Sequence, residues 1–365
     1  MGIESALYKL IDPQARGPEA VRGAMMNQVA YCRDNSAPNT ANVCLALFEL
    51  LDSARGGAVM DRVRAWAGPP LADALPLRVA GGIHALHLSG KAPDLAPIYA
   101  GEAPKDATER VANALERFEE YMLPWLDGPP QTNEAGRSWA FAASMLWLAN
   151  QGLPPHFAIR EFGSSAGINL MMGAFAFDLG GVKVGPDESP IALTPEWRGE
   201  APPGERVAIA SIKGCDVAPV DLRDPEQAGR LKAYVWPELN ARFERMEQAI
   251  QMAHQHPPHL ERKRAGQFVK EALAEKPAAG VTRVITHSVV WQYISADERK
   301  TITSAIEDAG AKAEDDAPLA WVSLEANRDT HRHELRVRYW PGGDGERLLA
   351  TAHPHGAWVE WCASS

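Results

Sequence analysis

Cysteine is scarce in this sequence: four residues in 365, with no spacing typical of a metal site or a redox pair. A disulfide-stapled scaffold is therefore excluded, and we expect four reduced thiols in a cytoplasmic protein. A leader-like start is also lacking, because no basic, then apolar, then small-residue pattern opens the chain.

Long apolar runs are missing as well. The longest uncharged stretch, residues 138–159, is interrupted at residues 150–152 and again at Pro154 and Pro155. About 11 apolar residues remain in one piece, whereas a helix that spans a bilayer needs about 20. We therefore expect no membrane partner.

Positive charge is in deficit, with 37 basic against 47 acidic side chains and a net charge of −10. A chain this acidic lacks the electrostatic footprint for a phosphate backbone, so we expect a small-molecule substrate and no nucleic acid. Hydrophobic residues (45%) and charged residues (23%) are in the proportions of a soluble globular protein, and the length predicts about two domains. The composition does not select an oligomeric state.

The first part of the chain has helical periodicity throughout. Apolar residues recur at helical spacing over residues 19–33, 39–53, 75–90, 106–126 and 134–151. We therefore predict a helical cap domain over residues 1–150.

After residue 150 the pattern alternates between strand and helix. Short apolar runs predict strands at 156–163, 206–216, 282–291 and 319–327, and the tail 333–361 predicts further strands. Helical patterns lie at 168–177, at 225–254 with a break near Trp236 and Pro237, and at 296–310. This order predicts an α/β domain over residues 151–365, with a mainly parallel sheet, helices around it and an antiparallel edge.

The segment from Glu161 to Asn169 lies between a predicted buried strand and a predicted helix. Its small residues Gly163, Ser165 and Gly167 permit a sharp turn and close approach of a ligand to the backbone. Open α/β sheets bind ligands at this end of a strand. A tight turn that binds nothing is the alternative.

The same turn also fits the nucleophile elbow of an α/β-hydrolase. Ser165 would then be the nucleophile, and Asp216 or Asp297 with a later histidine would complete the triad. Helical patterns before the turn, where a hydrolase has strands, argue against this interpretation.

Several segments resemble an uncharacterised bacterial family known as domain of unknown function 2332. They are residues 159–170 (IREFGSSAGINL), 212–238, 131–137 (QTNEAGR), 286–295 (THSVVWQYIS) and 351–361. That family in turn resembles the class I S-adenosylmethionine-dependent methyltransferases. The resemblance implies a Rossmann-like fold and S-adenosylmethionine as the cofactor.

The methyltransferase resemblance implies a set of cofactor-binding residues. Glu161, Gly163 and Gly167 match the acid and two glycines of the methyltransferase turn, Ser165 replaces the middle glycine, and Asn169 closes the segment.

Two more cofactor contacts follow from the same resemblance. Asp216 matches the acid that holds the cofactor ribose, although an aspartate that only caps a turn is the alternative. The usual acid for adenine is missing at residues 265–267, which leaves Gln267 as the candidate adenine partner.

The remaining candidates concern substrate and catalysis. His287 is the candidate general base, or a donor that only fixes a loop. Trp291 and Tyr293 would line a pocket or simply pack. Asn133, Glu134 and Arg137 form a polar block at the head of a helix, where Arg137 would meet an anionic group of the substrate or pair with a glutamate.

Eleven histidines raise the question of a metal. His254, His256 and His259 surround two prolines, and two further pairs are His331 with His333 and His353 with His355. No metalloprotease-type helical spacing occurs, so we expect no metal.

These observations favour methyl transfer from S-adenosylmethionine to a small-molecule acceptor. Because the missing acid weakens adenine recognition, a non-catalytic nucleotide- or metabolite-binding protein of the same fold is the alternative.

Overall fold

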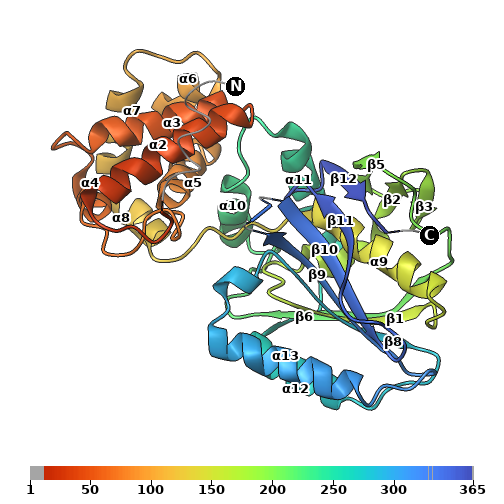
Figure 1. Cartoon of the computed structure of the whole chain (residues 1–365). Helices are drawn as coiled ribbons and strands as arrows, with labels where there is room; N and C mark the ends of the chain where they lie inside the picture. Colours follow the sequence, from red (N-terminus) through yellow and green to blue (C-terminus); the bar gives the residue numbers. More distant parts are fainter. Residues whose placement is uncertain (1–11, 328, 331, 364–365) are drawn as a thin grey trace. The chain divides into compact units, whose positions relative to one another are not determined.

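The computed structural model describes residues 12–327, 329–330 and 332–363, which divide into two compact units (Figure 1). The first, here the helical unit, comprises the described residues up to Thr132 together with Asp224–Glu244. The second, here the sheet unit, comprises residues 133–223 and the described residues from Arg245 onward. This division differs from the expected boundary at residue 150, because residues 133–150 belong to the sheet unit and a later segment returns to the helical unit.

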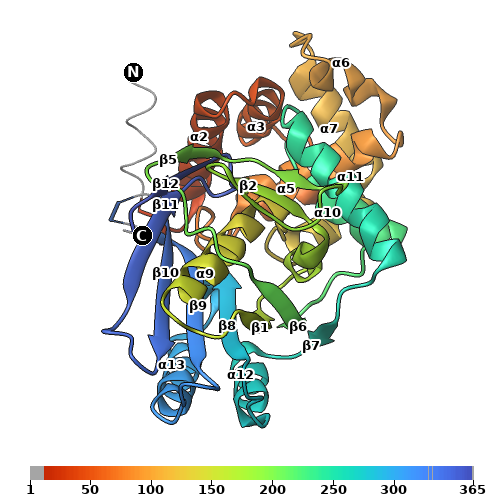
Figure 2. The same cartoon turned by 90° about the vertical axis from the view of Figure 1, so that its right-hand side faces the viewer.

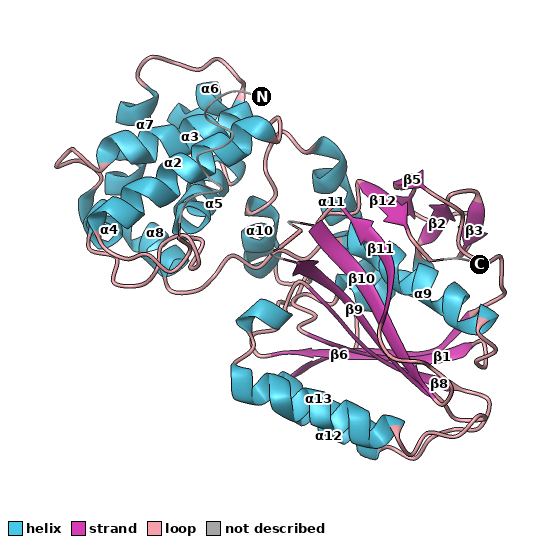
Figure 3. Ribbon diagram, in the orientation of Figure 1, coloured by secondary structure: helices cyan, strands magenta, loops and turns pink. Residues whose placement is uncertain are grey.

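All elements described in the helical unit are helices (Figure 3). They are α2 (Pro18–Asp34), α3 (Pro38–Leu50), α4 (Gly57–Arg64), α5 (Leu75–Leu88), η2 (Pro93–Leu95), α6 (Ala96–Tyr99), α7 (Ala107–Arg117), α8 (Glu119–Met122), η3 (Leu123–Leu126), α10 (Pro225–Ala233) and the first residues of α11 (Asn240–Gln255). Within the described residues, none of the chain's helices is long and apolar enough to cross a membrane.

Residues 224–244 are held to the helical unit by polar contacts. The Glu238 carboxylate accepts hydrogen bonds from the backbone N–H groups of Asn39 (2.6 Å) and Thr40 (2.9 Å) and from the Thr40 hydroxyl (3.0 Å). Helix α3 has Ala37 at its N-cap position and so lacks a side-chain cap of its own. Glu238 therefore supplies acceptors that the local sequence does not provide.

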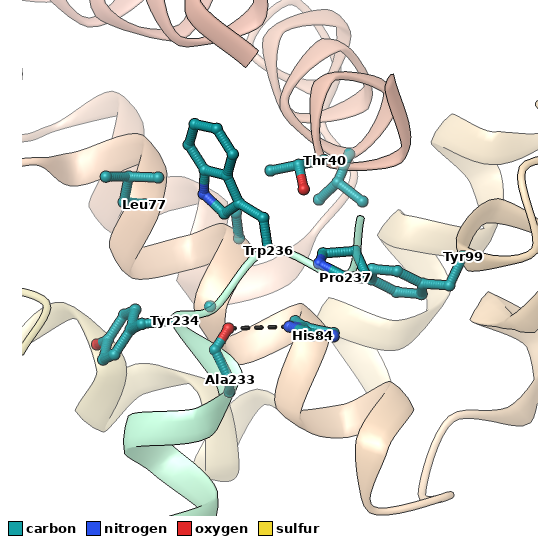
Figure 4. Close-up of a pocket in the computed structure, with 11 residues that line it drawn as sticks. Thr40, Leu77, His84, Tyr99, Ala233, Tyr234, Trp236 and Pro237 are labelled. Atoms are coloured by element: carbon teal, nitrogen blue, oxygen red, sulfur yellow. Dashed lines mark hydrogen bonds between the residues drawn. The ribbon is translucent and has the colours of Figure 1, made fainter. Parts of the chain in front are cut away.

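The same segment closes a small cavity of about 20 Å³, which has room for about one water molecule (Figure 4). His84 Nδ1 donates a hydrogen bond to the Ala233 carbonyl oxygen over 2.9 Å, and burial lowers the pKa of His84 to about 4. Gly81 lacks a side chain where the Tyr234 ring approaches, since a Cβ there would lie 2.6 Å from that ring. Burial of a neutral histidine and close packing thus fix this segment in the bundle.

The sheet unit contains the strands and three further α-helices. Its elements are η4 (Ala135–Arg137), α9 (Ser138–Asn150), β1 (His156–Phe162), η5 (Ile168–Ala174), β2 (Ala176–Leu179), β3 (Val182–Val184), β4 (Ala192–Leu193), β5 (Glu196–Arg198), β6 (Ala208–Asp216), β7 (Leu260–Arg262), α12 (Ala265–Ala274), β8 (Thr282–Ser288), η6 (Trp291–Tyr293), α13 (Ala296–Gly310), β9 (Leu319–Asn327), β10 (Arg332–Trp340), β11 (Arg347–Ala352) and β12 (Trp358–Trp361), with the rest of α11. The predicted strands and the helix at 296–310 are therefore present.

Nine strands of the described chain form one sheet, in the order β5-β12-β11-β10-β9-β8-β1-β6-β7 (Figure 2). Strands β7, β6, β1, β8 and β9 are parallel, whereas β9 to β12 pair antiparallel. This confirms the predicted α/β class with a mainly parallel sheet. Counted along the chain, the parallel strands run 3-2-1-4-5, so their order reverses between β1 and β8.

Helices cover both faces of this sheet. Phe162 and Ile285 pack with Phe268 of α12 and Ile302 of α13 on one face. On the other face Trp147 of α9 contacts Tyr339 of β10, with ring centroids 5.8 Å apart. Figure 1 shows α12 and α13 on one side of the strands and α9 on the other. The sheet is therefore the middle layer of three.

The predicted helix at 168–177 is wrong in type and length. Residues 168–174 form a 3₁₀ helix and residues 176–179 form β2, which pairs with β3 and β4 in a separate small sheet. The Ile168 backbone N–H donates to the Asn133 side-chain oxygen over 2.9 Å instead of pointing freely from a helix N-terminus. The local pattern did not reveal this long-range acceptor.

Candidate functional site

The carboxyl ends of β1, β6, β8 and β9 bring the candidate residues to one edge of the sheet. Strand β1 pairs in parallel with β6 on one side and β8 on the other, and β8 pairs with β9. The glycine turn (residues 163–167) follows β1, Asp216 ends β6, and His287 lies near the end of β8. In open α/β sheets ligands bind at this edge, beside the strand at which the order reverses.

The glycine turn has a left-handed backbone at three positions, with φ of 70° at Gly163, 53° at Ser165 and 73° at Gly167. Serine is unusual in this conformation, which favours glycine. The space beside both glycines is filled by the protein: a Cβ at 163 would overlap Val290, and one at 167 would lie 3.0 Å from Pro258. The glycines therefore admit these two side chains, whereas the sequence predicted that they admit a ligand.

Asp216 lies against the glycine turn, at the end of the neighbouring strand β6. Its Oδ2 accepts from the Ser165 backbone N–H over 2.8 Å, and its Oδ1 accepts from the Ala218 backbone N–H over 2.9 Å. A carboxylate offers about four lone-pair positions, so each oxygen retains one. The next residue, Val217, is 64% exposed. A polar acceptor and an uncovered apolar side chain thus lie side by side.

Glu161 is fully buried at the end of β1. Its Oε1 accepts from Asn169 Nδ2 over 2.8 Å, and Asn169 Oδ1 in turn accepts from the Ser138 hydroxyl over 2.8 Å. Its Oε2 has no hydrogen-bond partner among the described residues. Burial raises the pKa of Glu161 to about 7, while the hydrogen bond from Asn169 and the nearby charge of Arg137 act in the opposite direction.

His287 and Glu325 form a buried histidine–carboxylate pair. His287 Nδ1 lies 2.7 Å from Glu325 Oε1, and the same oxygen accepts from the backbone N–H groups of Val290 (3.0 Å) and Trp291 (3.2 Å). The imidazole stacks on both Phe162 and Trp291, with centroid distances of 4.6 and 5.1 Å. In the described structure His287 Nε2 is buried and has no hydrogen-bond partner.

The loop after His287 has a strained backbone. Val289 has φ of 53°, which is rare for a β-branched residue and costs of order 1–3 kcal/mol. Glu325 stabilises the loop through the next two N–H groups, and Val290 then packs on Gly163. The strain is therefore located between the histidine–carboxylate pair and the glycine turn.

The other predicted residues are distributed unevenly around this edge. Arg137 is buried, donates from Nε to the Pro354 carbonyl oxygen over 3.0 Å, and lies near enough to Glu161 and His333 to lower the pKa of both. Glu134 is also buried and accepts from Arg245, at 3.3 Å, and from the Gly136 backbone N–H. The polar block at 133–137 is thus part of the site region.

Two candidates do not face a buried site. Gln267 is exposed on α12, and its amide donates to Glu271 one helical turn away, over 2.8 Å. Tyr293 is 61% exposed, whereas Trp291 packs on His287.

No serine–histidine–aspartate triad is assembled at Ser165 among the described residues. Ser165 Oγ is buried without a hydrogen-bond partner among the described residues, and Asp216 contacts the Ser165 backbone instead of a histidine. A serine nucleophile needs a histidine within hydrogen-bond reach.

No group of three potential metal ligands is assembled in the part of the chain that the structure describes. His254 lies in the last turn of α11, and His256 and His259 lie in the loop before β7. His331 is outside the described residues.

Glu325 and Ser138 were not predicted as site residues from the sequence, and His333 was considered only as a possible metal ligand. Glu325 follows the apolar run of β9 near its carboxyl end, next to β8, and this position was a usable signal. The sequence offered no comparable signal for Ser138, because serine is common at the start of a helix. For His333, burial lowers the pKa to about 4, with Arg137 acting in the same direction.

A comparison with protein-family models matches residues 22–361 to a family described as an uncharacterised protein conserved in bacteria, DUF2332. No curated protein and no solved structure matches the chain. Since the matched range covers nearly the whole sequence, the chain belongs to the DUF2332 family, as its sequence motifs predicted.

Proposed function

We propose that this chain binds S-adenosylmethionine at the carboxyl edge of the sheet unit and transfers its methyl group to a small-molecule acceptor. The observation that carries the proposal is the meeting of the glycine turn and Asp216 beside the strand-order reversal, with 2.8 Å between the Ser165 backbone N and Asp216 Oδ2. In Rossmann-like sheets nucleotide cofactors bind at such a reversal, with an acid of the second strand on the ribose.

Asp216 and Val217 suit the nucleoside part of this cofactor. The remaining lone pairs of Asp216 can accept hydrogen bonds from two neighbouring hydroxyl groups. The exposed side chain of Val217 offers an apolar surface for a ring next to them. Gln267 is not part of this proposal, because its amide is bound to Glu271.

His287 is the proposed general base. Glu325 accepts from Nδ1–H and so leaves Nε2 as the basic atom, which has no partner in the described structure. S-adenosylmethionine carries its own leaving group, so the protein has to align the acceptor, exclude water and remove one proton. Stacking by Phe162 and Trp291 holds the imidazole in one orientation.

One observation favours the non-catalytic alternative, a nucleotide- or metabolite-binding protein. Both Asp216 oxygens already accept backbone hydrogen bonds, and the described residues 265–267 offer no acid for adenine. Binding and turnover therefore need separate tests.

Calorimetry with S-adenosylhomocysteine tests binding. Asp216→Ala removes an ionised acceptor, and we expect affinity to fall by roughly tenfold to a hundredfold. Asp216→Asn, which keeps an acceptor for Ser165, serves if the alanine variant unfolds. Asp221→Ala, in the same loop but paired with Arg223, is the control and should bind as the wild type does. Wild-type protein that binds no S-adenosylhomocysteine would refute the cofactor assignment.

Turnover is tested with S-adenosylmethionine labelled in the methyl group and a bacterial metabolite extract. We expect label in the small-molecule fraction, with His287→Gln reducing the rate by about a hundredfold or more while S-adenosylhomocysteine affinity is unchanged. Binding without transfer of label would favour the non-catalytic alternative.

A further inference from the structure

The helical unit has a separate cavity of about 580 Å³ that the proposed function does not use. It is formed by the end of α5 and the residues after it, by Tyr121 of α8, and by α10. All of these segments belong to the helical unit. The volume lies within the range of small-molecule sites.

Three of the charged side chains that line this cavity are basic and one is acidic. The basic residues are Lys91, Arg230 and Lys232 and the acidic one is Glu226, so the lining carries a net positive charge in a chain whose net charge is −10. This local reversal of sign attracts anions.

Two of the basic side chains have no carboxylate partner within the described residues. The Lys91 ammonium lies 4.3 Å from the centre of the Tyr121 ring, and the Arg230 guanidinium lies 4.3 Å from the centre of the Trp125 ring. Arg230 also donates one hydrogen bond, over 3.2 Å, to the Pro124 carbonyl oxygen. Aromatic faces thus hold both cations in position while most of their N–H donors stay available.

The rest of the lining is apolar or aromatic. Leu88 is 40% exposed, and Tyr121, which also lines the cavity, is half-buried. Burial raises the pKa of the Tyr121 phenol, and the nearby Glu226 acts in the same direction, so the ring stays neutral. Leu88 and Tyr121 therefore offer an apolar surface on which a ring or a short apolar chain of a ligand can pack.

We propose that this cavity binds a small organic anion, namely a carboxylate or phosphate group attached to a ring or apolar body. The anionic group accepts hydrogen bonds from Lys91 and Arg230, and the apolar part lies on Tyr121 and Leu88. Glu226 disfavours a second anionic group through like-charge repulsion.

Calorimetry with phenyl phosphate and phenylacetate tests this proposal and separates the two sources of the anion. We expect saturable binding of at least one probe, with affinity that falls as salt is raised. Lys91→Met and Arg230→Met should each weaken binding by about tenfold or more. Lys105→Met, an exposed lysine of the same unit outside the cavity, is the matched control and should not change it.

Benzyl alcohol is the neutral probe. Equal binding of benzyl alcohol, equal losses in Lys91→Met and Lys105→Met, or no saturable binding of either anion would each overturn the proposal. Because Arg230 also packs on Trp125, thermal unfolding of each variant is measured to detect a loss of binding that is caused by unfolding. If Arg230→Met is unfolded, the affinity of Lys91→Met alone tests the proposal.

Discussion

The helical unit and the sheet unit differ in what they bury. Of the buried polar residues described, only four belong to the helical unit: Gln28, Thr40, Arg78 and His84. Fourteen belong to the sheet unit: Asn133, Glu134, Arg137, Ser138, Ser144, Glu161, Ser164, Ser165, Asn169, Thr282, Thr286, His287, Ser288 and Glu334.

Burial of polar groups costs free energy unless each group is hydrogen-bonded. Four of those in the sheet unit leave a buried atom unpartnered among the described residues close to one edge: Glu161 Oε2, Ser165 Oγ, Thr286 Oγ1 and His287 Nε2. The interior of the helical unit is therefore mainly apolar, whereas this edge of the sheet unit retains buried polar groups that do not contribute to stability.

Truncation of the apolar core of the helical unit should have the largest effect. Leu47 is completely buried on α3, so Leu47→Ala should lower the free energy of unfolding by about 2–5 kcal/mol. Met26→Ala, at a position 38% exposed on α2, should change it by no more than about 0.5 kcal/mol. Urea unfolding of both variants measures these changes in the free energy of unfolding. Similar changes in the two variants would contradict the prediction.

The second prediction concerns Glu161 and the pH dependence of stability. Because its pKa is raised from 4.5 to about 7, the folded protein binds this proton more tightly than the unfolded chain does. The contribution is fully present below pH 4.5 and is lost as the pH rises through about 7, with a total of about 3 kcal/mol.

Glu161→Gln should remove this dependence, so the variant should gain stability over the wild type between pH 5 and pH 8. Urea unfolding across that pH range is the measurement. Glu334→Gln, at a second buried carboxylate that is paired with Arg336, should leave the wild-type slope in place. A wild-type slope in Glu161→Gln would show that this carboxyl is ionised throughout.

The smallest effect is expected at Thr286, whose hydroxyl is buried without a partner in the described structure. Thr286→Val keeps the shape and removes the unpartnered hydroxyl, so stability should stay level or rise by up to about 1 kcal/mol. Thr282 lies four residues earlier on the same strand and donates to the Pro154 carbonyl oxygen over 2.8 Å. Thr282→Val should therefore cost about 1 kcal/mol. Thermal unfolding of the two variants is the measurement. A larger loss of stability in Thr286→Val than in Thr282→Val would contradict the prediction.

Local periodicity of apolar residues was sufficient to predict the main helices and strands. The strand at 319–327 and the helix at 296–310 have the bounds that the sequence predicted, because apolar pattern and end signals agree there. The break near Pro237 also separates α10 from α11 as predicted. The predicted helix at 168–177 is wrong because residues 176–179 pair as a strand with residues 182–184 and 192–193, a pairing that the local apolar spacing does not reveal.

By itself, the sequence determined the family, the α/β class and the location of the glycine turn, since these depend on motifs and on repeating patterns within a few residues. Only the tertiary structure decided which side chains meet. It joined Glu325 to His287 across 38 positions, bound Asp216 to the glycine turn, turned Gln267 toward Glu271, and returned residues 224–244 to the helical unit. The physical reason is that a hydrogen bond or an ion pair depends on distance in space, and in a parallel sheet neighbouring strand ends come from distant parts of the chain.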